Sequence, residues 1–204
     1  MKAWIVVLSG VGLFVFAVAA GVFANELSWE EIGRGQMDVK IVLVDEDNPG
    51  TLYIGTGRGL FKSEEGSSTW RDILSMAGKQ KSVNFLLFDP KKKNSLYAAT
   101  SCGLFHSDNA GRSWQRIFKG RNPLEDDCSS VAVLDAKIYL GTGGGLFESS
   151  DRGRTWHRET GQVGESRVWG ICYTLSQEQA VYLAALEGAY VKQGSSENWE
   201  KIFT

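Results

Sequence analysis

Ser149-Ser-Asp-Arg-Gly-Arg-Thr-Trp156 is the stretch that decides the fold, because related stretches recur along the chain. Aligned on the tryptophan, the others end at Trp70, Trp114 and Trp199, which gives steps of 44, 42 and 43 residues. A second block, Ile138-Tyr-Leu-Gly-Thr-Gly-Gly-Gly-Leu-Phe147, also has a counterpart ahead of each tryptophan, starting at Leu52, Leu96 and Val181. Two motifs that recur in phase indicate a repeat architecture.

Each repeat contains the sequence of four short strands. The first is an apolar run, found at residues 39–44, 83–88, 131–134 and 168–173. The tyrosine block, the Gly-Leu-Phe block and the segment from the tryptophan supply the other three. Four strands in about 43 residues are typical of a propeller blade. The sequence therefore predicts an all-β propeller of four antiparallel four-stranded blades within residues 25–204, with units at 37–75, 82–118, 128–160 and 167–203.

An extra strand is predicted at residues 28–33, because Ser28-Trp29-Glu-Glu-Ile32 resembles Ser113-Trp114-Gln-Arg-Ile117. The last repeat already has its own fourth strand, at 198–203. The extra strand could therefore lie outside a closed four-bladed ring, form the edge of a degenerate fifth blade, or join a second chain in a larger ring. The sequence leaves these three alternatives open.

The first 24 residues contain Lys2 as their only charge and are otherwise apolar or small. Val22 and Ala24 are suitable small residues for signal-peptidase cleavage before Asn25. A run of about 20 apolar residues can also remain as a membrane anchor. Both alternatives place the rest of the chain in the periplasm, outside the cell, or on the outer face of the cytoplasmic membrane.

The charge balance, with 22 basic and 24 acidic residues, argues against nucleic-acid binding, which needs a basic surface. The three cysteines, Cys102, Cys128 and Cys172, lack the paired spacing of a zinc site, and we expect no metal or cofactor. Membrane contact is expected only through an uncleaved N-terminal anchor.

The turn before each tryptophan has its own chemistry. Ser149 and Asp151 can accept hydrogen bonds from nearby backbone N–H groups, and Gly153 permits a left-handed backbone. We expect the four tryptophans to pack between blades as framework, although an indole ring can also stack on a sugar.

These residues resemble the BNR or Asp-box repeat proteins, whose pattern is Ser-x-Asp-x-Gly-x-Thr-Trp. Ser149, Asp151, Gly153, Thr155 and Trp156 match it fully, and the other three copies match in part. The resemblance covers the chain from about residue 28 and implies a β-propeller fold. Because the superfamily includes sialidases, sortilin-like receptors and photosystem II stability/assembly factor-like proteins, it implies no single function. The compact Gly-Leu-Phe-x-Ser unit is most similar to the last group.

A sialidase-like enzyme would need three converging arginines, a Tyr/Glu nucleophile pair and an aspartic acid. Four of the six tyrosines occupy one repeated slot, which favours packing over catalysis: Tyr53, Tyr97, Tyr139 and Tyr182. No hydrolase, metalloprotease or phosphate-binding motif is present. We therefore predict a non-catalytic protein.

Strand alternation places the second-to-third strand turns and the loops between repeats on one face of the propeller. In the related proteins the binding site usually lies on that face. Candidate binding residues there are Arg58, Arg121, Arg167, Lys81 and Glu165. The same geometry brings Cys102 near Cys128, which predicts a disulfide, while Cys172 is expected to be a buried thiol.

The function predicted from sequence is a non-catalytic exported scaffold that binds a protein or assists assembly. Self-association to complete the ring is a further possibility. The alternative is a glycan-binding protein or a sialidase-like glycoside hydrolase.

Overall fold

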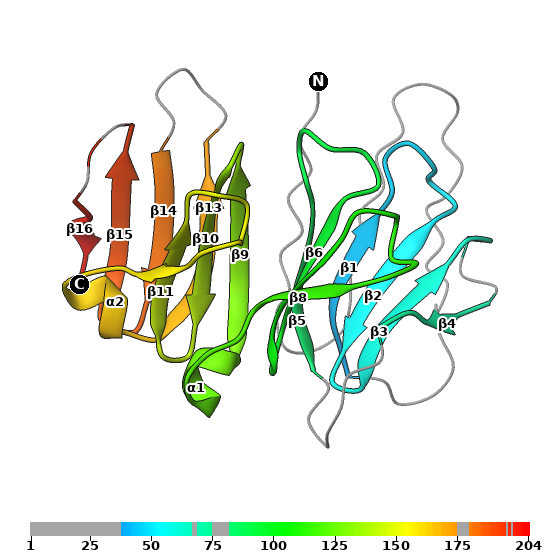
Figure 1. The fold of residues 1–204 in the computed structure, drawn as a ribbon, viewed down its shortest axis with the longest axis horizontal. Helices are drawn as coiled ribbons and strands as arrows, with labels where there is room; N and C mark the ends of the chain where they lie inside the picture. The colour runs from blue at the N-terminus through cyan, green and yellow to red at the C-terminus, as the bar shows by residue number, and fades with distance from the viewer. Residues whose placement is uncertain (1–37, 67–68, 75–81, 175–179, 195, 197) are drawn as a thin grey trace, which may run out of the picture.

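The computed structural model describes residues 38–66, 69–74, 82–174, 180–194, 196 and 198–204. Four antiparallel four-stranded sheets stand side by side in chain order (Figure 1). The predicted all-β fold of four four-stranded blades is therefore confirmed. The predicted leader or anchor (1–24) and extra strand (28–33) lie outside the described residues. Within them, no helix is both long and apolar enough to cross a bilayer.

Each blade runs through its strands in sequence order, from the inner strand to the outer. Blade 1 consists of β1 (Val39–Val44), β2 (Leu52–Thr56), β3 (Gly59–Ser63) and β4 (Arg71–Asp72). Blade 2 consists of β5 (Val83–Phe88), β6 (Leu96–Thr100), β7 (Gly103–Ser107) and β8 (Gln115–Phe118). Blade 3 consists of β9 (Cys128–Leu134), β10 (Lys137–Thr142), β11 (Gly145–Ser149) and β12 (His157–Arg158). Blade 4 consists of β13 (Val168–Tyr173), β14 (Ala180–Ala185), β15 (Gly188–Gln193) and β16 (Glu200–Phe203).

Two short helices, α1 (Pro123–Asp126) and α2 (Gln162–Glu165), lie in the loops that lead into blades 3 and 4. Neither helix was predicted from the sequence. For α1 the signal was present: Asn122 is its N-cap and accepts hydrogen bonds from the N–H groups of Leu124 and Glu125. Proline at the first position of a helix is favourable because its missing N–H group would have no partner there.

The core consists of three apolar clusters, one between each pair of neighbouring blades. We call the side of a blade that meets the next blade its forward face and the opposite side its rear face. The repeated tyrosine lies on the forward face, and Tyr53, Tyr97 and Tyr139 are at most 3% exposed. The tyrosine slot is therefore a packing position wherever another blade follows.

A small residue on the second strand of each blade provides the seat for the next blade. Gly55 seats Val83, and a Cβ atom added at Gly55 would lie 2.8 Å from Val83 Cγ1. Gly141 seats Val168 in the same way, and Ala99 packs in one cluster with Cys128. Val83, Cys128 and Val168 are each fully buried as a result.

The tight turn before β12 shows how the repeated serine and aspartate act. The Ser149 hydroxyl accepts a hydrogen bond from the Gly153 N–H at 2.8 Å, and Gly153 has a left-handed φ of +85°. Asp151 accepts bonds from both the N–H and the hydroxyl of Thr155. This turn delivers Trp156 to blade 2, where its Nε1 donates to the Ile117 carbonyl at 2.8 Å.

We expect Trp156→Ala to destabilise the protein by about 3 kcal/mol, because it removes a large, partly buried ring and a hydrogen bond between blades. Leu124→Ala, at a side chain on α1 that is 56% exposed, should change stability by no more than about 0.5 kcal/mol. Equilibrium denaturation in urea measures both. Equal effects of the two substitutions would contradict this role for Trp156.

The Asp151 turn also predicts a pH dependence. Hydrogen bonds from Thr155 lower the pKa of Asp151 from 3.8 to about 2. Because the pKa is lower in the folded protein than in the unfolded chain, the ionised carboxylate stabilises the fold at pH values above the unfolded-state pKa. This stabilisation is lost as the pH falls from about 4 towards 2. Asn109 shows that an amide fits the equivalent turn of blade 2, where its Oδ1 accepts from the Ser113 N–H.

The stability difference between the native protein and Asp151→Asn should therefore narrow as the pH falls. Urea midpoints at about pH 5 and about pH 2 provide the comparison. A difference that stays constant between these two conditions would show that the ionised carboxylate contributes nothing beyond the amide.

Candidate binding site

The loop between blades 2 and 3 is organised around a buried carboxylate. Glu125 on α1 is only 6% exposed. Its Oε2 accepts a hydrogen bond from the Arg121 N–H at 2.8 Å, and its Oε1 accepts one from Asn122 Nδ2 at 3.1 Å. Arg158 Nη2 lies 3.7 Å from the same carboxylate. These contacts compensate the cost of burying the charge and fix the loop against blade 3.

A groove of about 270 Å³ lies beside this loop, between blades 2 and 3. It is lined by Ile117, Phe118, Lys119, Arg121, Glu125, Phe147, Trp156 and Arg158. The Phe118 ring centroid lies 4.9 Å from that of Phe147 and 5.2 Å from that of Trp156. Phe118 and Phe147 belong to the core between the two blades and are 5% and 8% exposed, whereas Trp156 is partly exposed. The groove therefore has an aromatic base, and Trp156 is its most accessible ring for apolar or planar groups of a ligand.

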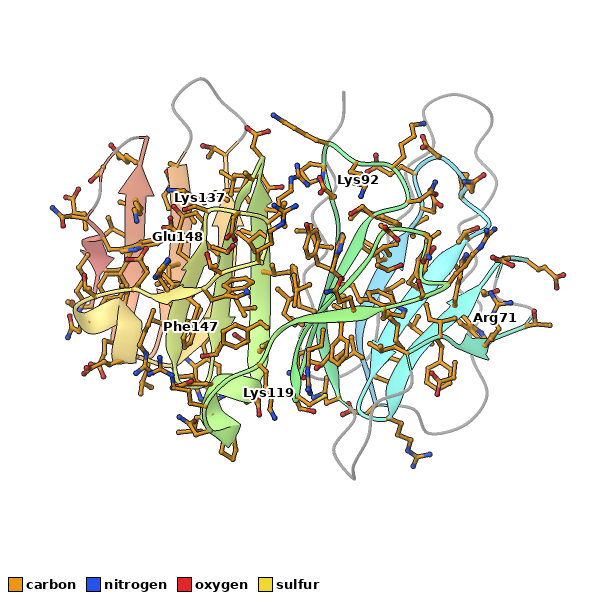
Figure 2. The ribbon with its side chains drawn as sticks, viewed as in Figure 1. Arg71, Lys92, Lys119, Lys137, Phe147 and Glu148 are labelled. Carbon is orange, nitrogen blue, oxygen red and sulfur yellow. The ribbon has the colours of Figure 1, made fainter. Side chains whose placement is uncertain are left out.

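The charge around the groove is unevenly compensated. Arg158 is engaged by Glu125 and lies over the Phe147 ring. Lys119 and Arg121 are exposed, and neither side chain forms an ion pair within the described part of the chain. In Figure 2, Lys119 lies at the end of the molecule that carries α1, whereas Lys92 lies at the opposite end. Two cations beside an aromatic groove suit a ligand that carries carboxylates.

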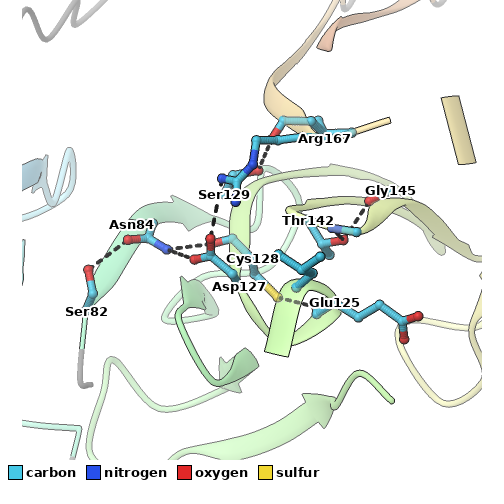
Figure 3. Close-up of polar contacts among 12 residues, drawn as sticks. Ser82, Asn84, Glu125, Asp127, Cys128, Ser129, Thr142, Gly145 and Arg167 are labelled. Carbon is cyan, nitrogen blue, oxygen red and sulfur yellow. Dashed lines mark hydrogen bonds and ion pairs between the residues drawn. The ribbon is translucent and has the colours of Figure 1, made fainter. Parts of the chain in front are cut away.

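A second polar feature runs along the inner strands (Figure 3). Lys40 Nζ donates to Asn84 Oδ1 at 3.2 Å. Asn84 Nδ2 donates to Asp127 Oδ1 at 3.3 Å and to the Cys128 carbonyl at 2.8 Å. Arg167 Nη1 lies 3.5 Å from Asp127 Oδ2. One chain of contacts thus joins all four blades and holds the loop face in register.

A β-bulge lies behind this row of contacts. In every blade the register shifts at the second residue of the inner strand, which is Lys40, Asn84, Ser129 or Trp169. A bulge redirects the side chain it carries. In blades 1 to 3 that side chain bonds the following blade, as with Ser129 Oγ, which donates to the Val168 carbonyl at 2.7 Å. In blade 4, Trp169 is 56% exposed.

The binding residues predicted from sequence have separate surroundings. Arg121 lines the groove, whereas Arg167 is paired with Asp127 and lies over the Trp169 ring at 5.1 Å. Arg58 is exposed in the turn between β2 and β3, and Glu165 is exposed at the end of α2. Lys81 lies outside the described residues. These assignments therefore stay predictions, with Arg121 in the best-formed surroundings.

The structure corrects two expectations about cysteine. Cys128 is a buried thiol, so the disulfide predicted between Cys102 and Cys128 is absent. Cys128 Sγ faces the Glu125 carbonyl, while Cys102 Sγ lies 3.4 Å from Thr100 Oγ1. Burial raises the pKa of the Cys128 thiol well above its ordinary value. Cys172 was expected to be buried and is instead exposed. It lies on the forward face of blade 4, which no described blade covers.

Sequence reasoning missed Phe118, Phe147 and Arg158 as residues of a possible site. Phe147 belongs to the repeated Gly-Leu-Phe block and therefore had the pattern of a packing residue. The available signal was the loop after Phe118, where Asn122-Pro123 marks a helix start and Lys119 and Arg121 bracket a glycine. Among the described residues, no group of histidine, cysteine, aspartate or glutamate side chains is arranged to hold a metal ion.

No family model matches the chain, and no curated protein matches it in sequence. Solved structures resemble it in fold, and three of them serve as examples. A GH74 enzyme from Niastella koreensis is 18% identical, with a TM-score of 0.65, and the match covers 81% of this chain and 30% of that one. The extracellular domain of a protein described as a hybrid two component system from B. thetaiotaomicron is 17% identical, with a TM-score of 0.64, over 84% of this chain and 22% of that one. YCF48 bound to D1 peptide is 15% identical, with a TM-score of 0.55, over 80% of this chain and 54% of that one.

These likenesses support the propeller-type fold and, at such low identity, nothing finer. The chain spans less than two thirds of the length of each of the three proteins. The Asp-box assignment stays a resemblance carried by the residues of the turn.

The inner-strand contacts give a test of how the loop face is held. Asn84→Ala should destabilise the protein by about 1–3 kcal/mol, because it leaves partners in blades 1 and 3 without a hydrogen bond. Asn198→Ala, at an exposed position in blade 4, should have an effect below about 0.5 kcal/mol. Urea denaturation compares the two, and an effect of Asn84→Ala as small as that of Asn198→Ala would contradict a bridging role.

Proposed function

We propose that the protein is a non-catalytic, exported scaffold that binds an acidic, extended segment of a partner protein. The segment lies in the groove between blades 2 and 3, with carboxylates beside Lys119 and Arg121 and apolar side chains against the partly exposed Trp156. The observation that carries this proposal is a pair of exposed cations beside an aromatic groove, with no ion-pair partner among the described residues.

Two comparisons support a protein partner outside the cytoplasm. YCF48 has been solved bound to D1 peptide, so a propeller of similar fold can hold a peptide. The B. thetaiotaomicron protein is an extracellular domain, which agrees with an export signal at residues 1–24. At 17% and 15% sequence identity, these two structures support the proposal through the likeness in fold alone.

The glycoside hydrolase alternative has weaker support in this groove. Glycosidases use two carboxylates that flank the bond to be cleaved. Among the described residues, Glu125 is the one carboxylate that lines the groove, and Arg121, Asn122 and Arg158 already engage it. The described lining of the groove therefore lacks the second carboxylate that this reaction needs.

Binding of labelled peptides, followed by fluorescence anisotropy, tests the proposal. Acidic peptides with aromatic or apolar residues should bind more tightly than basic or neutral peptides of equal length, and rising salt should weaken the binding. Lys119→Glu combined with Arg121→Glu should raise the Kd at least about tenfold, which corresponds to about 1.4 kcal/mol.

Lys92→Glu is the control for position, because it reverses an exposed charge at the opposite end of the molecule, and the single variant Lys119→Glu matches it in charge. Lys92→Glu should leave the Kd within about twofold of the native value. Equal loss in the control and the double variant would indicate non-specific charge attraction. Tight binding or hydrolysis of neutral oligosaccharides, unaffected by the double variant, would replace the peptide proposal with the glycan alternative.

A further inference from the structure

The forward face of blade 4 has the composition of an interface but no described blade on it. Tyr182 occupies the slot of Tyr53, Tyr97 and Tyr139, and it is 37% exposed where the others are at most 3% exposed. The strand register makes this equivalence direct, because Cys172 pairs with Tyr182 as Leu87 pairs with Tyr97. Ala184, the counterpart of the seats Gly55, Ala99 and Gly141, is exposed as well.

Blade 4 is also more apolar at two slots that are polar in the other blades. Trp169 replaces Lys40, Asn84 and Ser129 at the bulge. Val191, which is itself only 4% exposed, replaces Lys62, His106 and Glu148, the residues paired with the repeated tyrosine. A terminal repeat that faces water normally has a polar outer face. Blade 4 therefore lacks the features of a cap.

The rear face of blade 1 is the complementary half of such an interface. Val39 has the register position of Val83, Cys128 and Val168, which each fill a seat and are fully buried. Val39 itself is only half-buried, and Val44 on the same strand is 38% exposed. One chain thus has an exposed seat, Ala184, on blade 4. On blade 1 it has a half-buried residue, Val39, in the position that fills a seat in the other blades. We call Val39 the plug.

We propose that two copies of this chain associate head to tail, with the rear face of blade 1 of one copy packed on the forward face of blade 4 of the other. The contact repeats the packing that occurs three times within the chain, with Val39 seated on Ala184. Two copies supply eight blades, which is within the usual range of four to eight for a closed propeller. A head-to-tail contact closes into a ring when its rotation allows.

Sedimentation velocity of the full chain over a range of concentrations should show a dimer. Ala184→Arg fills the seat and Val39→Asp places a charge on the plug, so each variant should raise the dimer Kd at least about tenfold. A mixture of the two variants retains one native contact per pair, between the intact plug of the first and the intact seat of the second. It should therefore form a heterodimer at concentrations where each variant alone is monomeric.

A covalent test guards against variants that fail to fold. Cys172 has the position of Leu87, which packs on the cluster that contains Val131, and the blade 1 counterpart of Val131 is Val42. Val42→Cys should give a disulfide-linked dimer on mild oxidation, and adding Cys172→Ser should abolish it. In the native dimer, Cys172 should react with a thiol reagent several-fold more slowly than in Val39→Asp.

A monomer at all concentrations would overturn the proposal. So would a dimer that depends on Ala184 but is indifferent to Val39, because that pattern fits two blade 4 faces packed together. Peptide affinity is not measured in these experiments, so failure of the dimer and failure of the proposed peptide binding are distinguishable.

Discussion

The structure depends on close approach between the inner strand of one blade and the second strand of the blade before it. At Gly55 and Gly141 this approach leaves no room for a side chain, and the β-branched residues Val83 and Val168 occupy the space. Close packing of this kind makes neighbouring blades rigid with respect to each other, because a well-packed interior has no voids into which side chains could move. Every polar contact between blades relies on the distance that this packing sets.

Much of the fold could be predicted because its decisive residues repeat. The tyrosine slot, the Gly-Leu-Phe block and the tryptophan recur in phase, and repetition separates them from chance. The environment of Cys172 could not be predicted in the same way. Its strand has an apolar pattern like the inner strands of the other blades, but burial depends on whether another blade follows, which strand composition does not encode.

The candidate groove was only partly predictable, because it combines repeated and unrepeated residues. Phe147 belongs to the repeat and has the pattern of a core residue, whereas Arg121 lies in the unrepeated loop that contains α1. Their proximity follows from the buried Glu125, which ties the loop to blade 3 through Arg158. Sequence pattern gives the residue types of such a site, but the pairing of one carboxylate with particular donors is a property of the fold.

The bulge on the inner strand shows how one backbone feature can serve different purposes in a repeat protein. It directs Lys40, Asn84 and Ser129 towards the next blade, where each forms a hydrogen bond across the gap. The backbone shift also occurs in blade 4, where the side chain is Trp169. A hydrogen-bonding residue there would have no described partner, while an indole can bury a large area against another apolar face. The change from polar to aromatic at this one slot therefore gives the forward face of blade 4 an apolar group suited to the head-to-tail contact proposed above.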